Sequence, residues 1–300
     1  MSRRERDERR KRLAQDAPPV EADAEAAPVM ADVAEDEDEA GALVVGEARE
    51  ASVTPTEAEK VSAATYDVYL EETADGTTLA LIVDLPGCFA SGASRQDALD
   101  HLQQATAAYH TWLRLHDEYT PEVHGPFVFS VKEVFRIVAE GEYDVHGFFA
   151  PDAEPATDED IEWALTLLDW QRQDLLEQIG ALPDAALDWK PGNAADGQTI
   201  RQLLDHIAQA EVWYMGRLDE TPPRIDVSAL PGPTLDRLQR VRQAVTMRVK
   251  SYPKELRGKV FTHRGEQWTL RKALRRAVWH ERDHFRDIDA LLAGYRAAQR

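Results

Sequence analysis

Cysteine is almost absent from this sequence, and long apolar runs are missing. Cys88 is the only cysteine among 300 residues, so the chain cannot form an intramolecular disulfide of the kind that stabilises many secreted domains. No apolar run approaches the roughly 20 residues that a helix needs to span a bilayer. We therefore expect a cytoplasmic protein with no membrane partner.

Positive charge is scarce in the first half of the chain. Residues 1–60 hold 17 acidic and 9 basic residues, and residues 61–156 hold 16 acidic and 4 basic ones. Residues 157–300 hold 22 of each, so the formal net charge of -20 comes from the first two regions. Because acidic surfaces repel phosphate backbones, we expect no nucleic-acid partner.

Residues 13–60 lack aromatic side chains and are rich in Ala, Glu and Asp. A segment of this composition cannot bury enough apolar surface to offset the conformational entropy lost on folding. The acidic run from Glu35 to Glu39 disfavours packing further. We expect residues 1–60 to form a disordered acidic tail.

Residues 61–150 have the pattern of a small α+β domain. Apolar runs bounded by turn residues predict strands over residues 66–71, 77–84, 88–90 and 127–137. A helix is predicted from the N-cap Ser94 to about residue 116. Asp84, Pro86 and Gly87 are expected to shape a turn. Residues 151–156 are expected to form a short acidic linker after this domain.

Beyond residue 156 the apolar residues recur at helical spacing. The pattern predicts four amphipathic helices, which begin near Thr157, Thr199, Thr234 and Thr269. The last helix is expected to end at about Leu292, with Gly294 as its stop signal. Four such helices predict an all-α four-helix bundle over residues 157–300, and hence a multidomain protein.

Three histidines lie on the apolar faces of two of these helices. His280 and His284 are four residues apart, which places both side chains on one helix face. His206 lies within the apolar stripe of the second helix. Imidazole suits zinc, nickel, copper and iron, and we expect zinc or nickel. Three protein ligands leave a position for water or substrate, as in catalytic zinc sites.

A competing interpretation is that the inward histidines are ordinary core residues held by hydrogen bonds. Under this interpretation the bundle contains no metal site. The two interpretations differ in whether the three imidazoles meet at one point.

Residues near the histidines in sequence are candidates for supporting roles. Asp287, three residues after His284, can accept the second imidazole N–H, act as a fourth ligand, or pair with an arginine. Trp213 can wall a pocket beside the metal or simply fill the core. Asp205 and Glu281 point about 100° away from their histidine neighbours, so we expect both to be solvated. No other residue is predicted to be catalytic or to bind a cofactor.

Two stretches of the predicted bundle resemble the DinB/YfiT-like family. Residues 199–218 (TIRQLLDHIAQAEVWYMGRL) and 268–292 (WTLRKALRRAVWHERDHFRDIDALL) are similar to its second and fourth helices. Trp189-Lys190-Pro191 is similar to its first connection, and the resemblance covers about residues 155–295.

The DinB-like resemblance implies an up-down-down-up bundle in which His206, His280 and His284 bind a divalent metal. Characterised relatives include metal-dependent thiol transferases and thiol-dependent isomerases that act on small molecules. The resemblance therefore implies a small-molecule substrate. It also implies self-association, since relatives often form homodimers.

The first domain resembles the HicB-like antitoxins. The resemblance rests on residues 79–105 (LALIVDLPGCFASGASRQDALDHLQQA) and covers about residues 64–137. It implies a HicB-like α+β fold. Those antitoxins usually continue into a DNA-binding helix-turn-helix or ribbon-helix-helix, whereas a predicted bundle follows here. We therefore expect this domain to bind a protein partner.

These observations favour an enzyme, a metal-dependent thiol S-transferase or hydrolase acting on a small molecule. Because the predicted bundle contains no cysteine, thiol chemistry there requires an external low-molecular-weight thiol. The alternative is a non-enzymatic interaction or regulatory protein that uses its HicB-like domain, with the metal structural or absent. A third reading is a bundle that binds an apolar ligand without metal.

Overall fold

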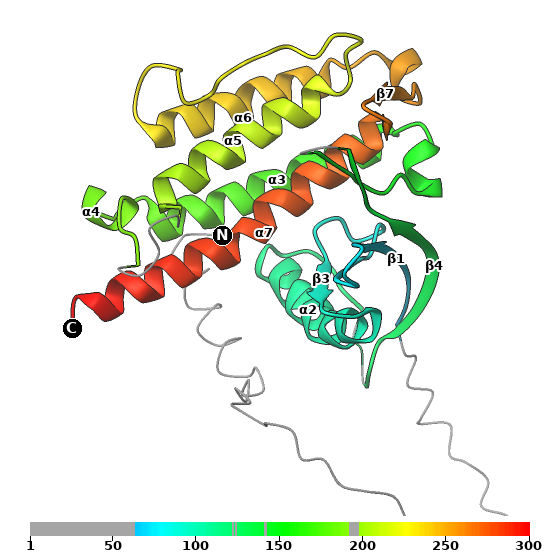
Figure 1. Ribbon diagram of the computed structural model, residues 1–300, viewed down its shortest axis with the longest axis horizontal. Coiled ribbons are helices and arrows are strands. Elements are labelled where there is room, and N and C mark those ends of the chain that lie inside the picture. Colours follow the sequence, from blue (N-terminus) through cyan, green and yellow to red (C-terminus); the bar gives the residue numbers. More distant parts are fainter. Residues whose placement is uncertain (1–63, 122, 124, 141–142, 192–197) are drawn as a thin grey trace, which may run out of the picture. The chain divides into compact units, whose positions relative to one another are not determined.

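The computed structural model describes residues 64–121, 123, 125–140, 143–191 and 198–300, shown in colour in Figure 1. An α+β region comes first in the chain and a helical region follows it. Both belong to one compact unit, Ala63–Arg300. The disordered tail predicted over residues 1–60 lies outside the described residues.

A mixed four-stranded sheet forms the centre of the α+β region, with the strand order β3-β2-β1-β4. Its elements are β1 (Thr65–Glu72), β2 (Thr78–Leu81), β3 (Phe89–Gly92), α2 (Arg95–Leu115) and β4 (Val128–Arg136). Strands β1, β2 and β3 pair antiparallel, and β4 returns parallel to β1. Ser94 accepts a hydrogen bond from the Asp97 amide, which confirms the predicted N-cap.

The second strand is shorter than predicted, because the chain turns before residue 84. The Ile82 amide donates to the Cys88 carbonyl at 3.1 Å, and the Cys88 amide donates to the Leu85 carbonyl at 2.8 Å. Gly87 has a φ of +88°, and a Cβ there would lie 3.0 Å from Val278 Cγ1 in the last helix. The turn therefore needs glycine both for its backbone conformation and for close packing.

Short elements connect the α+β region to the helices. They are the hairpin of β5 (Val138–Glu140) and β6 (Tyr143–Val145) and the 3₁₀ turn η1 (Ala150–Ala153). η1 overlaps the predicted acidic linker of residues 151–156, and its Asp152 is fully buried. Arg275 donates to both carboxylate oxygens of Asp152, at 3.0 and 2.6 Å, which balances the buried charge.

Long helices, which lie side by side in Figure 1, dominate the rest of the chain. They are α3 (Asp158–Ile179), α5 (Ile200–Gly216), α6 (Thr234–Lys250) and α7 (Leu270–Ala298). The shorter elements are α4 (Asp184–Leu187), η2 (Lys254–Leu256), β7 (Phe261–His263) and β8 (Glu266–Trp268). Helix α5 packs against α6 and α7, and α3 packs against α7 and α6. Within the described residues, no helix has the length and apolarity that crossing a bilayer demands.

Hydroxyl caps set the starts of three of these helices, at threonines where helices were predicted to begin. Thr157, Thr199 and Thr269 each accept a hydrogen bond from the backbone amide three residues later. The predicted end of the last helix is wrong, because α7 continues past Gly294 to Ala298. A Cβ on Gly294 would lie 2.6 Å from the Trp189 ring, so this glycine makes room for an indole rather than ending the helix.

Helix α7 is one of the helices that contact the α+β region. Arg276 of α7 pairs with the buried Glu71 of β1 at 3.5 Å. The Arg282 guanidinium lies 4.8 Å from the Tyr109 ring centroid and 4.5 Å from that of Trp112, both on α2. One continuous apolar core includes residues of both regions. These contacts hold in place the helix that carries two of the three predicted ligands.

Candidate metal centre

The predicted histidines meet between α5 and α7. Nε2 of His280 lies 3.1 Å from Nε2 of His206, and Nε2 of His284 lies 3.2 Å from Nε2 of His280. One ligand nitrogen from each ring lies within 4.8 Å of the other two. Among the described residues, these three side chains form a group that can hold a metal ion.

Two of the three nitrogen–nitrogen separations match those expected around a single ion. Two nitrogens bound to one zinc ion at about 2.0–2.1 Å in tetrahedral geometry lie about 3.3 Å apart. The measured separations of 3.1 and 3.2 Å are close to this value. Hydrogen bonds between the rings span about the same distance, so metal analysis rather than spacing distinguishes a metal centre from core histidines held by hydrogen bonds.

The protonation of the rings also suits a metal. Burial, and then the neighbouring His284, His206 and Arg276, lower the pKa of His280 to about 2. Burial, and then His284, lowers the pKa of His206 as well. Both rings are therefore neutral at pH 7, and the neutral imidazole is the form that offers a lone pair to a metal.

Asp287 lies where the sequence suggested, one turn beyond His284. Its Oδ2 lies 2.9 Å from His284 Nδ1. A carboxylate at this position favours the tautomer with its proton on Nδ1, and Nε2 of the same ring is directed at the other histidines. The carboxylate is bound to the ring rather than to the point where the Nε2 atoms meet.

The three rings differ in their access to solvent. His206 is the most exposed of the three, His284 is intermediate and His280 lies deepest. The buried ring of Tyr214 packs edge-on against His280, with ring centroids 5.8 Å apart. The site therefore has a walled side at His280 and an open side at His206.

Comparison with known proteins gives one match. Residues 167–288 match the family model of the DinB superfamily, and this range includes all three histidines and Asp287. Residues 167–288 are thus similar to the DinB superfamily, and we refer to this part as the DinB-like domain. Neither the curated proteins nor the solved structures include a match to this chain.

Trp213 of the DinB-like domain packs against other aromatic rings. It lies edge-on to Trp268 with ring centroids 5.3 Å apart, and the Arg217 guanidinium lies 4.3 Å above it. Trp268 in turn contacts Tyr214, which touches His280. Trp213 thus supports the residue that covers His280, and a direct role as pocket wall stays a prediction.

A buried cluster of four charges lies beside the site, and sequence reasoning missed it. It contains Arg172 of α3, Glu211 of α5, Arg242 of α6 and Glu281 of α7. Arg172 binds Glu211 at 2.5 Å and Glu281 at 2.8 Å, and Arg242 binds Glu211 at 2.8 Å and Glu281 at 2.5 Å. Two positive and two negative charges balance, so none is left unpaired in the core.

The prediction that Glu281 is solvated is therefore wrong, since the residue is 1% exposed. Its side chain does point away from the histidines, but it faces α3 and α6 rather than water. Asp205, also predicted to be solvated, is partly buried and is bound by Arg237 at 2.7 Å. A signal existed in the sequence, because Arg172 lies four residues after the buried Leu168 and three before the buried Leu175.

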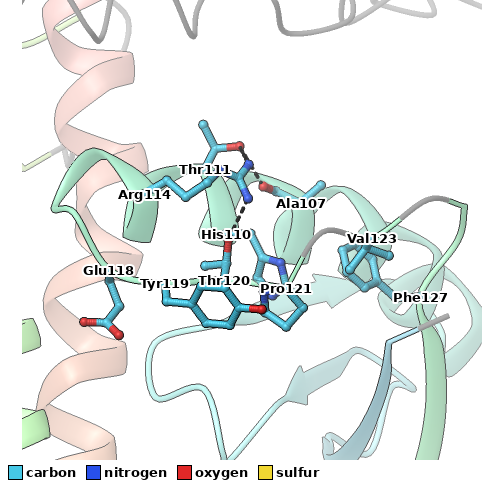
Figure 2. A pocket seen from close by; sticks show the side chains of 10 residues that line it. All are labelled: Ala107, His110, Thr111, Arg114, Glu118, Tyr119, Thr120, Pro121, Val123 and Phe127. Carbon is cyan, nitrogen blue, oxygen red and sulfur yellow. Dashed lines mark hydrogen bonds between the residues drawn. The ribbon is translucent and has the colours of Figure 1, made fainter. Parts of the chain in front are cut away.

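A separate cavity in the described part of the chain, of about 600 Å³, lies at the end of α2. Figure 2 shows Arg114 there, tied to the hydroxyls of Thr111 and Thr120. His110 lines this cavity and bonds to the Tyr66 hydroxyl at 2.8 Å. None of the three clustered histidines lines it, so it is a separate feature of the α+β region.

Proposed function

We propose that the DinB-like domain is a metal-dependent enzyme that acts on a small molecule, as a thiol S-transferase or a hydrolase. The observation that supports this most is the convergence of three imidazoles with an open side at His206. We also propose that its long helices form the up-down-down-up four-helix bundle that the family resemblance implies.

The side chains present suit a bound zinc or nickel ion. His206, His280 and His284 would hold the ion through Nε2, and Asp287 orients His284 by accepting its Nδ1 proton. Tyr214 covers His280 and excludes water from the inner side. An ion at this point would lower the pKa of a coordinated thiol or water molecule, which makes either a better nucleophile at neutral pH.

Any thiol that reacts at this site must come from outside the chain. The only cysteine, Cys88, is buried in the α+β region, where its Sγ lies 3.7 Å from Thr106 Oγ1. Burial raises the pKa of the Cys88 thiol to about 11, so it stays protonated and unreactive. A low-molecular-weight thiol that enters by the open side is the nucleophile that fits a transferase.

Turnover with defined substrates tests this function. Protein loaded with zinc or nickel is assayed against a panel of low-molecular-weight thiols paired with small electrophiles, and against small esters and amides for hydrolysis. We expect turnover that stops with chelator and in His284→Ala, and that continues in His101→Ala, whose histidine is exposed on α2. No metal-dependent turnover across both panels would contradict the proposal.

A second candidate function is an interaction role for the α+β region, which we propose is HicB-like. The observation that favours it is β4, an edge strand with Val128, Val131 and Val134 exposed. Exposed edge strands pair with further strands. The partner we propose is a second copy of the chain, so wild-type protein should sediment as a dimer and Val134→Lys as a monomer. A monomeric wild type would contradict this role.

A further inference from the structure

A groove in the helical region lies between α5, α6 and the connection that joins them. Its volume is about 310 Å³. The residues that line it are Val212, Met215, Gly216, Pro223, Ile225, Leu230, Arg240, Val241, Ala244, Val245 and Arg248. None of the three clustered histidines is among them. The groove is therefore separate from the candidate metal centre.

The lining of the groove is almost wholly apolar. Side chains of α5 and α6 form two walls, and Pro223, Ile225 and Leu230 of the connection form a third. Ile225 is 43% exposed, and a ligand in the groove would cover part of this apolar side chain. Binding is favourable when an apolar group replaces water in such an apolar cleft.

Two arginines supply the only charge in this lining. The Arg248 guanidinium pairs with Asp219 at 2.8 Å, so its charge is balanced. Arg240 donates to the Pro231 carbonyl and takes part in no ion pair among the described residues of the chain. The groove thus combines an apolar body with one unbalanced cation, a combination that suits a ligand with an apolar chain and an anionic head.

We propose that this groove binds medium-chain carboxylates, with the hydrocarbon chain between α5 and α6 and the carboxylate at Arg240. The size of the chain follows from the volume. A methylene is about as large as a water molecule, which takes roughly 30 Å³, so the groove has room for about ten non-hydrogen atoms. Octanoate, with eight carbons and two oxygens, matches this size.

Calorimetric titration of the full chain with octanoate, octanol and butyrate tests the proposal. Octanol has the same eight-carbon chain without the negative charge, and butyrate has the charge with a much shorter hydrocarbon chain. We expect octanoate to bind about twofold to fivefold more tightly than octanol, which is the contribution of one exposed charge pair, and butyrate not to bind measurably. The titrations are run with chelator, so that a carboxylate bound to metal is not counted.

Two pairs of variants assign the binding to the groove. Ala244→Phe fills the groove and should abolish binding of octanoate and octanol, whereas Gln243→Phe, on the exposed side of the same helix, should change neither. Arg240→Ala should remove the preference for octanoate over octanol. Lys250→Ala removes an exposed cation of α6 outside the groove and should leave the preference intact.

Three results would overturn the proposal. One is no octanoate binding to the wild-type protein. Another is octanoate binding that Ala244→Phe leaves unchanged. The third is a wild-type dimer that Ala244→Phe converts to a monomer, since this would show that a second copy of the chain occupies the groove. Failure of the metal-dependent assays would leave the proposal standing, because no histidine of the candidate centre lines the groove.

Discussion

At the scale of a single residue, Asp287 sets the orientation and tautomer of the His284 ring. The carboxylate accepts the Nδ1 proton of His284, so the ring keeps the tautomer whose Nε2 can bind a metal. Asp287 is exposed and His284 is mostly buried, with side-chain exposures of 58% and 16%. The bond therefore acts through orientation and tautomer rather than through a strong buried ion pair.

Replacing Asp287 should weaken metal binding without unfolding the protein. We expect Asp287→Ala to lower the affinity for zinc by about tenfold to a hundredfold, the usual effect of losing a group that orients a ligand. Asp287→Asn should lose less, since its amide oxygen still accepts the Nδ1 proton. Competition titration against a chromophoric chelator measures the affinity. Asp283→Ala, on the same helix, serves as the control, and an equal loss in all three variants would contradict the assignment.

At the scale of a single element, the end of helix α7 depends on a residue that is distant in the sequence. Glycine near the end of an apolar pattern is typical of a helix stop. Gly294 instead lies within α7, where the Trp189 ring occupies the space that a Cβ would take. The contact joins residues more than 100 positions apart, so local pattern alone did not reveal it.

A substitution at Gly294 should have an effect whose sign depends on Trp189. Alanine in place of an interior helix glycine normally stabilises by about 0.5–1 kcal/mol. Here the Cβ would lie 2.6 Å from the indole, so we expect Gly294→Ala to lower the free energy of unfolding. In a Trp189→Ala background the same change should raise it. Urea denaturation of the four proteins measures both effects, and stabilisation in both backgrounds would contradict the close contact.

The elements whose ends were well predicted are those whose caps are local. Ser94, Thr157 and Thr269 each satisfy an amide three residues away, which sequence alone can reveal. The histidine trio was predictable for a similar reason, because helical spacing fixes which face each ring occupies. The burial of Glu281 was not predictable in this way. Helical spacing gives the direction of its side chain but not which neighbouring helices pack on that face.

At the scale of the whole described molecule, buried ion pairs join segments that lie far apart in the sequence. Arg275 and Arg276 of α7 pair with Asp152 of η1 and Glu71 of β1. His146 lies among them, with its carbonyl 3.1 Å from Lys272 Nζ. Burial, and then Arg276, Lys272 and Arg275, lower the pKa of the His146 ring to about 2.

This histidine should make the whole fold less stable in acid. The unfolded chain takes up a proton at His146 below about pH 6.5, whereas the folded chain resists it down to about pH 2. The free energy of unfolding should therefore fall as the pH drops below 6.5, by at most about 1.4 kcal/mol per pH unit from this residue. Urea denaturation between pH 5 and 7 with chelator, compared with His146→Gln, measures the slope. Identical slopes would contradict the burial of a neutral ring.

The central claim is that three imidazoles from α5 and α7 bind one metal ion. Metal analysis of the purified protein tests it most directly, with His206→Ala, His280→Ala and His284→Ala beside the control His101→Ala. The account predicts about one equivalent of zinc or nickel in the wild type and in the control, and almost none in the three variants. Equal metal content in the wild type and in His280→Ala would contradict it.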